Sequence, residues 1–165
     1  MVPGDPGRGE RGGRGALLRP ARRGPRAAPA LRGPALRPDL VSDIVCFARE
    51  YRLFVLDGAV HDGSRYAVGP RLDPAPLDLD PYAADVRAFA AELLAAADGS
   101  LPSAAVVDVG LLEEGGWAAI EANPAWASGG YACDPDRVLD VVLRAAGPRN
   151  ESAPADLPLA RTAQR

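Results

Sequence analysis

Short apolar runs separated by turn residues predict alternating strands and helices along most of the chain. The segment 40–56 is largely extended and becomes rich in β-branched and aromatic residues towards its end. The dipeptide Asp57-Gly58 is a strong signal for a two-residue hairpin turn. Residues 59–68 are therefore predicted to form the returning strand, and the Pro- and Asp-rich residues 69–79 a loop.

Apolar residues recur every three or four positions in two further segments, which predicts two amphipathic helices. Asp80, followed by a proline, offers an N-cap for the first helix, which is expected to end near Gly99. Asp134, also followed by a proline, is predicted to cap a second helix over 136–146. The two apolar faces consist of Val86, Phe89, Ala90, Leu93 and Leu94, and of Val138, Val141, Val142 and Ala145.

Between the two helices lies the segment 106–124, VVDVGLLEEGGWAAIEANP, which reads as two apolar strands joined by a tight turn. The element order is then strand, strand, helix, strand, strand, helix. This order predicts an α+β fold in which an antiparallel sheet packs against two helices.

Asp108, Glu121 and Asn123 are polar interruptions in these apolar strands. Because side chains alternate between the two faces of a strand, Glu121 and Asn123 share one face. A four-residue turn would pair Asp108 with Glu121, whereas a two-residue turn would pair it with Asn123. Either even turn gathers all three groups on one face, but a three-residue turn would separate them.

Directly opposed carboxylates such as Asp108 and Glu121 repel each other, with Cβ atoms about 4.5–5.5 Å apart. A divalent cation would offset that repulsion, and Mg²⁺ prefers carboxylate and other hard oxygen ligands. Asn123 would add a neutral carbonyl oxygen. Two alternatives remain open at this point: a polar strand face turned to solvent, or a carboxylate pair bridged by Arg52.

Composition narrows the chemistry. The single His and the two distant Cys residues exclude a metal site built on those residue types. All 19 basic residues are Arg, so no mechanism can depend on a lysine. No apolar run approaches the roughly 18 residues needed to cross a bilayer, and the N-terminus lacks a secretory apolar segment. We therefore expect a cytoplasmic protein that does not contact the membrane.

Residues 1–38 contain 8 Gly, 7 Pro and 9 Arg, and this composition predicts a disordered arm. Such an arm could bind RNA or an acidic surface, or it could be a solvated tail without a selected role. It has no aromatic residue to stack on bases. Residues 41–165 carry 10 Arg against 19 acidic residues, so the body is acidic and we do not expect nucleic-acid binding.

The arrangement of Asp108 on one strand and Glu121-Ala122-Asn123 on the next resembles the magnesium-binding signature of ATP-grasp enzymes. The order of elements is similar to the C-terminal half of the ATP-grasp fold. The segments 50–58 (EYRLFVLDG) and 123–131 (NPAWASGGY) also resemble a bacterial ATP-grasp family of mostly uncharacterised domains.

The resemblance covers residues 41–146, and we place the domain at 39–147, between the arm and a disordered tail at 148–165. ATP-grasp enzymes use ATP to convert a carboxylate into an acyl phosphate, which an amine or thiol then attacks. The resemblance therefore implies ATP and Mg²⁺ as cofactors and a small-molecule or peptide carboxylate as substrate.

The resemblance also implies roles for single residues. Asp108 and Glu121 would hold one Mg²⁺ ion, and Glu121 and Asn123 a second. A positive charge near the metals stabilises a phosphoryl transition state, and Arg52 is the candidate for this catalytic role. Glu50 lies two residues before Arg52, faces the same way and is assigned to the cofactor site with it. The alternative for these two residues is an ordinary salt bridge on one strand.

Two departures from the family pattern limit these expectations. The preceding half of an ATP-grasp domain normally supplies a lysine and the adenine contacts, and nothing in this chain corresponds to it. Many members carry an Arg where this chain has Val106. We therefore expect the C-terminal part of an ATP-grasp domain that does not catalyse ligation by itself. The alternative is a non-catalytic remnant, or a partner-binding module without nucleotide turnover.

Overall fold

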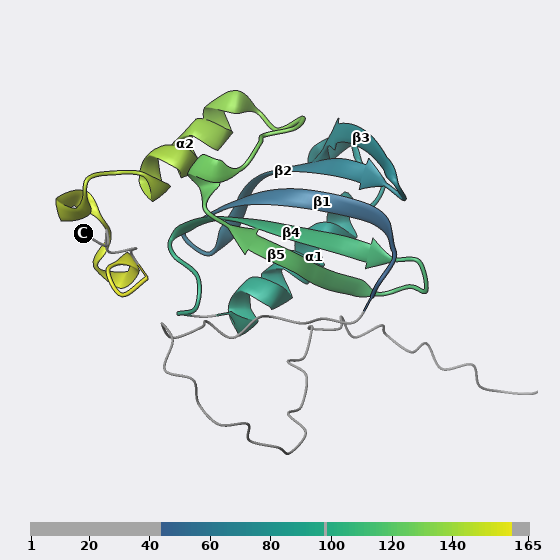
Figure 1. Ribbon diagram of the computed structural model, residues 1–165, viewed down its shortest axis with the longest axis horizontal. Helices are drawn as coiled ribbons and strands as arrows, with labels where there is room; N and C mark the ends of the chain where they lie inside the picture. The colour runs from purple at the N-terminus through teal and green to yellow at the C-terminus, as the bar shows by residue number, and fades with distance from the viewer. Residues whose placement is uncertain (1–43, 98, 160–165) are drawn as a thin grey trace, which may run out of the picture.

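The computed structural model describes residues 44–97 and 99–159. Its five strands form one antiparallel sheet in the order β3-β2-β1-β4-β5, with a helix packed on each face (Figure 1). The bounds are β1 Phe47–Leu56, β2 Ala59–Val68, β3 Arg71–Pro76, α1 Ala83–Ala96, β4 Ala104–Leu112, β5 Trp117–Asn123 and α2 Pro135–Ala145. The predicted α+β class, an antiparallel sheet with two helices, is confirmed.

The β1–β2 hairpin turns at the predicted dipeptide. Asp57 and Gly58 both have positive φ, 49° and 78°, as a type I′ turn requires. This turn matches the right-handed twist of the two strands, and β2 begins at the predicted residue, Ala59. The local hairpin signal was therefore sufficient to place both strands.

The prediction of a plain loop over 69–79 was wrong, because Arg71–Pro76 forms β3. This strand lies at the edge of the sheet and pairs only with β2. Pro74 and Pro76 have no N–H to donate, and an edge strand tolerates this because one of its sides has no partner strand. A short 3-10 helix, Leu77–Leu79, then leads towards α1.

The predicted cap of α1 was also wrong. The helix begins at Ala83 with Tyr82 at the N-cap, and no side chain caps it. Asp80 instead accepts hydrogen bonds from the Tyr82 backbone N–H at 2.9 Å, from the Tyr51 hydroxyl at 3.0 Å and from Arg65 Nη1 at 2.6 Å. A carboxylate with partners on two strands was recruited into the core network rather than onto the helix end.

The predicted cap of α2 is confirmed, since the Asp134 carboxylate accepts a hydrogen bond from the Asp136 N–H at 2.9 Å. A proline opens the helix in its first turn. There its missing N–H costs nothing. The helix ends at Ala145, close to the predicted end.

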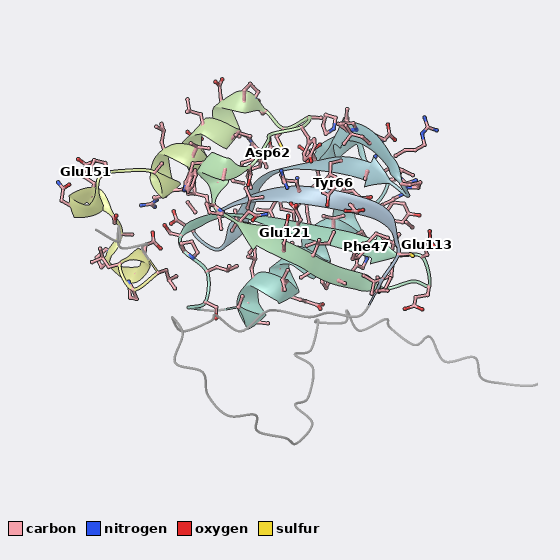
Figure 2. The ribbon with its side chains drawn as sticks, viewed as in Figure 1. Phe47, Asp62, Tyr66, Glu113, Glu121 and Glu151 are labelled. Atoms are coloured by element: carbon pink, nitrogen blue, oxygen red, sulfur yellow. The ribbon has the colours of Figure 1, made fainter. Side chains whose placement is uncertain are left out.

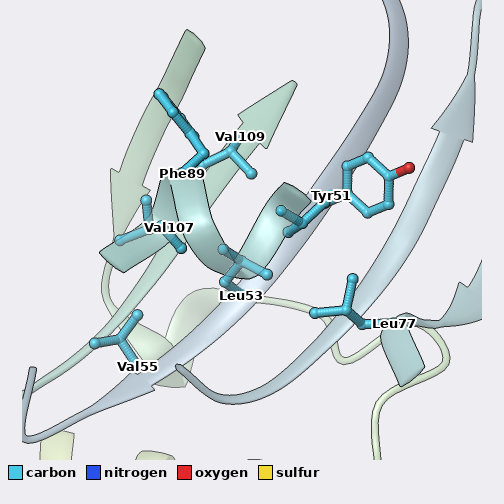
Figure 3. Close-up of a cluster of buried hydrophobic side chains, with 9 residues drawn as sticks. Tyr51, Leu53, Val55, Leu77, Phe89, Val107 and Val109 are labelled. Carbon is cyan, nitrogen blue, oxygen red and sulfur yellow. The ribbon is translucent and has the colours of Figure 1, made fainter. Parts of the chain in front are cut away.

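Alternation along β1 and β4 divides their side chains between two cores. One core, under α1, contains Tyr51, Leu53, Val55, Leu77, Val86, Phe89, Ala90, Val107 and Val109 (Figure 3). The other, under α2, contains Phe54, Ala104, Val106, Ala125 and Val141. Arg52 and Asp108 alternate with members of the first core, so they lie on the α2 face of the sheet.

Residues 149–159 carry two short 3-10 helices, Arg149–Glu151 and Pro154–Asp156, within the segment where the sequence predicted a tail. The Asp156 carboxylate accepts hydrogen bonds from the Ser103 backbone N–H at 2.6 Å and from its hydroxyl at 2.5 Å. The predicted arm, 1–38, lies outside the described residues. Within the described part of the chain, neither helix has the length and apolarity that a membrane crossing requires.

Candidate functional site

The β4–β5 hairpin pairs Asp108 directly with Glu121, as predicted, and it places Asn123 opposite Val106. Paired residues of an antiparallel ladder project from the same face. Asn123 follows Glu121 by two positions and shares that face. The hairpin therefore brings all three predicted oxygen ligands to the α2 face of the sheet.

The ladder reaches this register differently from the predicted route. Near the turn, Trp117 pairs with Leu111, not with Leu112 as a simple four-residue turn would require. The register shifts by one residue beside Asp108, where Ile120 is the extra residue on β5. This β-bulge restores the pairing of the two acids, and bulges of this kind re-aim side chains next to functional sites.

The three ligand candidates differ in their access to solvent. The side chain of Asp108 is 2% exposed, whereas Glu121 is exposed and Asn123 is half-buried. Figure 2 shows Glu121 on β5, which is an edge strand of the sheet. A bound ion would therefore be anchored on the buried Asp108 and reached from the side of β5.

Arg52 is the cross-strand neighbour of Asp108 and forms a bidentate ion pair with it. Arg52 Nε donates to Asp108 Oδ1 at 2.9 Å, and Nη2 donates to Oδ2 at 2.6 Å. Burial raises the pKa of Asp108, and the hydrogen bonds from Arg52 oppose that rise. The hydrogen bonds to Asp108 raise the pKa of Arg52, so the guanidinium stays charged and balances the buried carboxylate.

The alternative in which Arg52 bridges both acids holds only for Asp108. Within residues 44–97 and 99–159, the Glu121 side chain has no hydrogen bond or ion pair of the usual geometry. Glu121 nevertheless lies near enough to raise the pKa of Asp108 by charge repulsion. One carboxylate on this face is thus neutralised by protein, and the other is free to meet a cation from solution.

Glu50 and Arg52 do not form the strand salt bridge that the sequence left open, because Arg52 turns to Asp108. Glu50 Oε2 instead accepts a hydrogen bond from the Tyr66 hydroxyl at 2.5 Å. Burial and this hydrogen bond raise the pKa of Tyr66, so its hydroxyl remains a donor. Glu50 therefore orients an aromatic ring beside Arg52 and does not contact Arg52 itself.

The loop that follows β5 closes over Arg52. Its first part is a 3-10 helix, Ala125–Ala127, and the Gly129 carbonyl then accepts a hydrogen bond from Arg52 Nη1 at 3.3 Å. Tyr131 lies over the same guanidinium, with Arg52 Cζ 5.1 Å from its ring centroid. Sequence reasoning missed Tyr131, although the two glycines before it mark a loop that must bend sharply.

A family model described as an ATP-grasp domain, the second family of its clade, matches residues 33–141. The chain belongs to this ATP-grasp family. No curated protein and no solved structure matches the chain. The matched range contains the whole sheet and all the residues that the sequence assigned to the site, so the predicted resemblance is confirmed.

The oxygen ligands of this ATP-grasp domain fit Mg²⁺ in kind. Two carboxylates and one amide oxygen are hard donors, and Mg²⁺ is usually bound through one or two carboxylates, with water and phosphate completing its octahedron. No group of three or more His, Cys, Asp and Glu side chains with metal-binding geometry occurs in the described residues. A metal held here would therefore take most of its ligands from water and a bound phosphate.

A cavity of about 640 Å³ opens beside Asn123 in the ATP-grasp domain. Pro124 and Trp126 line one side of it, and Ser152 and Leu159 of the C-terminal segment line the other. Trp126 is 59% exposed, unlike Trp117, which packs in the α1 core. The cavity gives the α2 face a mostly apolar compartment next to a ligand candidate.

The two thiols are expected to differ in reactivity. Burial raises the pKa of Cys133 to about 12, whereas Cys46 is exposed. Because the thiolate is the reactive form, iodoacetamide at pH 8 should label Cys46 at least roughly tenfold faster than Cys133. Peptide mass spectrometry over time measures both rates, and equal rates would show that the loop around Cys133 opens freely.

Proposed function

We propose that this protein binds Mg-ATP on the α2 face of its sheet and takes part in ligase-type activation of a carboxylate. The observation that carries the proposal is the direct pairing of Asp108 with Glu121, with Asn123 on the same face, in a member of an ATP-grasp family. Like charges opposed across a ladder destabilise it unless a cation lies between them. This pairing is therefore a cost that metal binding would offset.

Each residue has a role in this proposal. Asp108 and Glu121 hold one Mg²⁺ ion, and Glu121 with Asn123 holds the second. Arg52 places a fixed positive charge beside the metals, where charge develops during phosphoryl transfer. Glu50 keeps Tyr66 against Arg52 through the 2.5 Å hydrogen bond.

Bound ATP supplies the phosphoryl group that turns a carboxylate into an acyl phosphate. The residues of this chain orient the phosphates and balance their charge, and the nearly full burial of Asp108 keeps that ligand out of bulk water. Electrostatic interactions are stronger where water is excluded. The carboxylate substrate is a small molecule or a peptide, and the amine or thiol acceptor approaches from solution.

Isothermal titration calorimetry of Mg-ATP tests the site. Glu121→Gln is expected to weaken Mg-ATP binding at least about tenfold, because it removes one anionic ligand of each ion. Glu121 is exposed and has no protein partner to lose, so the stability of the fold should not change. Asp108→Asn is expected to weaken binding as well.

Glu113→Gln is the matched control, because Glu113 is an exposed acid at the far end of the same hairpin (Figure 2). It removes the same charge without touching the site and should bind Mg-ATP as the wild type does. Replacing Mg²⁺ with EDTA should abolish ATP binding in the wild type and in this control. Unchanged affinity in both Glu121→Gln and Asp108→Asn would overturn the metal assignment.

The bidentate contact between Arg52 and Asp108 favours a second candidate function. Both oxygens of Asp108 already accept a hydrogen bond from protein, so the pair is complete without a metal. A protein with this arrangement could serve as a partner-binding module that keeps the fold without nucleotide turnover. Absence of Mg-ATP binding in the wild type, together with a normal unfolding transition, would select this alternative.

A further inference from the structure

Tyr131 has a backbone conformation that bulky residues rarely adopt. Its φ is 48°, in the left-handed region, where Gly and Asn are the common residues and an aromatic residue is unusual. Within the described part of the chain, the only other non-glycine residue with positive φ is Asp57 in the β1–β2 turn. An unusual backbone conformation at such a residue persists only where its surroundings impose it.

The chain on both sides of Tyr131 is anchored to the sheet. Before it, the Gly129 carbonyl accepts a hydrogen bond from Arg52. After it, the Ala132 N–H donates to Ser64 Oγ at 3.2 Å. Ser64 is fully buried and its hydroxyl also contacts the backbone of β2 and β3. These two anchors fix the backbone on each side and direct the Tyr131 ring inwards over Arg52.

The ring of Tyr131 completes a stack. Tyr66 and Tyr131 have centroids 5.1 Å apart and planes 14° from parallel. Arg52 Cζ lies 5.8 Å from the Tyr66 centroid and 5.1 Å from the Tyr131 centroid, within the range of cation–π attraction. Tyr131 is nevertheless 43% exposed, so burial of the ring in a core does not explain its position.

Arg52 retains hydrogen-bonding capacity under this stack. A guanidinium has five N–H groups, and Arg52 uses one on Nε and one on each Nη atom for Asp108 and Gly129. The remaining N–H on Nη1 and the remaining N–H on Nη2 have no acceptor among residues 44–97 and 99–159. Two such donors suit an anion with several oxygens, such as a phosphoryl group.

We propose that Tyr131 is a positioning residue, whose ring holds the Arg52 guanidinium in the plane from which its two free N–H groups bind a phosphate of Mg-ATP. This rests on the function proposed above. Without the ring, Arg52 would keep its pair with Asp108 but its outer edge would rotate and exchange freely. The phosphate would then meet a disordered donor and bind less tightly.

Two substitutions separate the ring from the backbone. Tyr131→Phe keeps the stack, whereas Tyr131→Asn removes it and still tolerates positive φ. The nitrogen-15 NMR signals of the Arg52 side chain, assigned by their loss in Arg52→Lys, report on the guanidinium directly. We expect distinct, slowly exchanging Nη signals in the wild type and in Tyr131→Phe. In Tyr131→Asn we expect shifted signals and faster exchange.

Mg-ATP titration of the same proteins supplies the second readout. Affinity should fall about tenfold in Tyr131→Asn and stay near the wild-type value in Tyr131→Phe. Unchanged Arg52 signals in Tyr131→Asn would overturn the positioning role, and altered signals with unchanged affinity would overturn the link to phosphate. A wild type that does not bind Mg-ATP overturns the proposed function, and the Arg52 signals then decide the positioning role alone.

Discussion

Arg52→Met is expected to destabilise the fold by about 3–5 kcal/mol, because it leaves a buried carboxylate without its partner. Asp108 is 2% exposed and accepts two hydrogen bonds, both from Arg52. Methionine keeps much of the length and packing of the arginine stem but brings no charge and no donor. Urea unfolding followed by circular dichroism measures the change in the free energy of unfolding.

Arg144→Met is the matched control. Arg144 also reaches both oxygens of a carboxylate, that of Asp57, at 3.0 Å, but these two side chains are 40% and 60% exposed. An exposed pair of this kind contributes about 0–1 kcal/mol. If Arg52→Met costs no more than Arg144→Met, burial does not make the Arg52 pair special and the prediction is wrong.

A double variant and added metal refine the interpretation. Arg52→Met with Asp108→Leu should recover most of the lost stability, because no buried charge remains. In Arg52→Met alone, Mg²⁺ should raise the free energy of unfolding more than it does in the wild type, since a cation can then take the place of the guanidinium at Asp108. The same rise in the double variant would show that the ion acts elsewhere.

Local signals were sufficient wherever neighbours in sequence decide the structure. The positive-φ turn at Asp57-Gly58 and the Asp134 cap depend on adjacent residues, and both occur as predicted. The pairing of Asp108 with Glu121 was also predicted, but from a turn register that is one residue off and is corrected by the bulge at Ile120. Period-two alternation fixes which face a residue takes, and it cannot reveal an offset that a bulge cancels.

The partners of the site residues could not be read from the sequence, because they come from other strands. Arg52 and Asp108 are 56 positions apart and become neighbours only because β1 lies between β2 and β4. The sequence offered Glu50 as the partner of Arg52 because the two are close along one strand. Tyr131 was missed because its backbone conformation is imposed by contacts to β1 and β2, and no residue beside it encodes that conformation.

Asp80→Ala is the second change with a large expected effect, again about 3–5 kcal/mol of destabilisation. The Asp80 side chain is fully buried. It joins β1 to β2 and to the start of α1, through Tyr51, Arg65 and the Tyr82 N–H. Alanine would leave the Tyr51 hydroxyl buried without an acceptor and would remove one of the two carboxylates that pair with Arg65.

Asp78→Ala provides the comparison, because Asp78 lies two residues away and pairs with Arg87 at the surface, where the two side chains are 69% and 41% exposed. Its loss should cost about 0–1 kcal/mol. Asp80→Asn should lie between the two variants, since an amide can still accept from Tyr51 but carries no charge for Arg65. If Asp80→Ala and Asp78→Ala unfolded at the same urea concentration, Asp80 would be an ordinary helix-end acid, as the sequence first indicated. A larger loss for Asp80→Ala would show that this buried carboxylate ties the sheet to α1, beneath the face that carries the proposed ATP site.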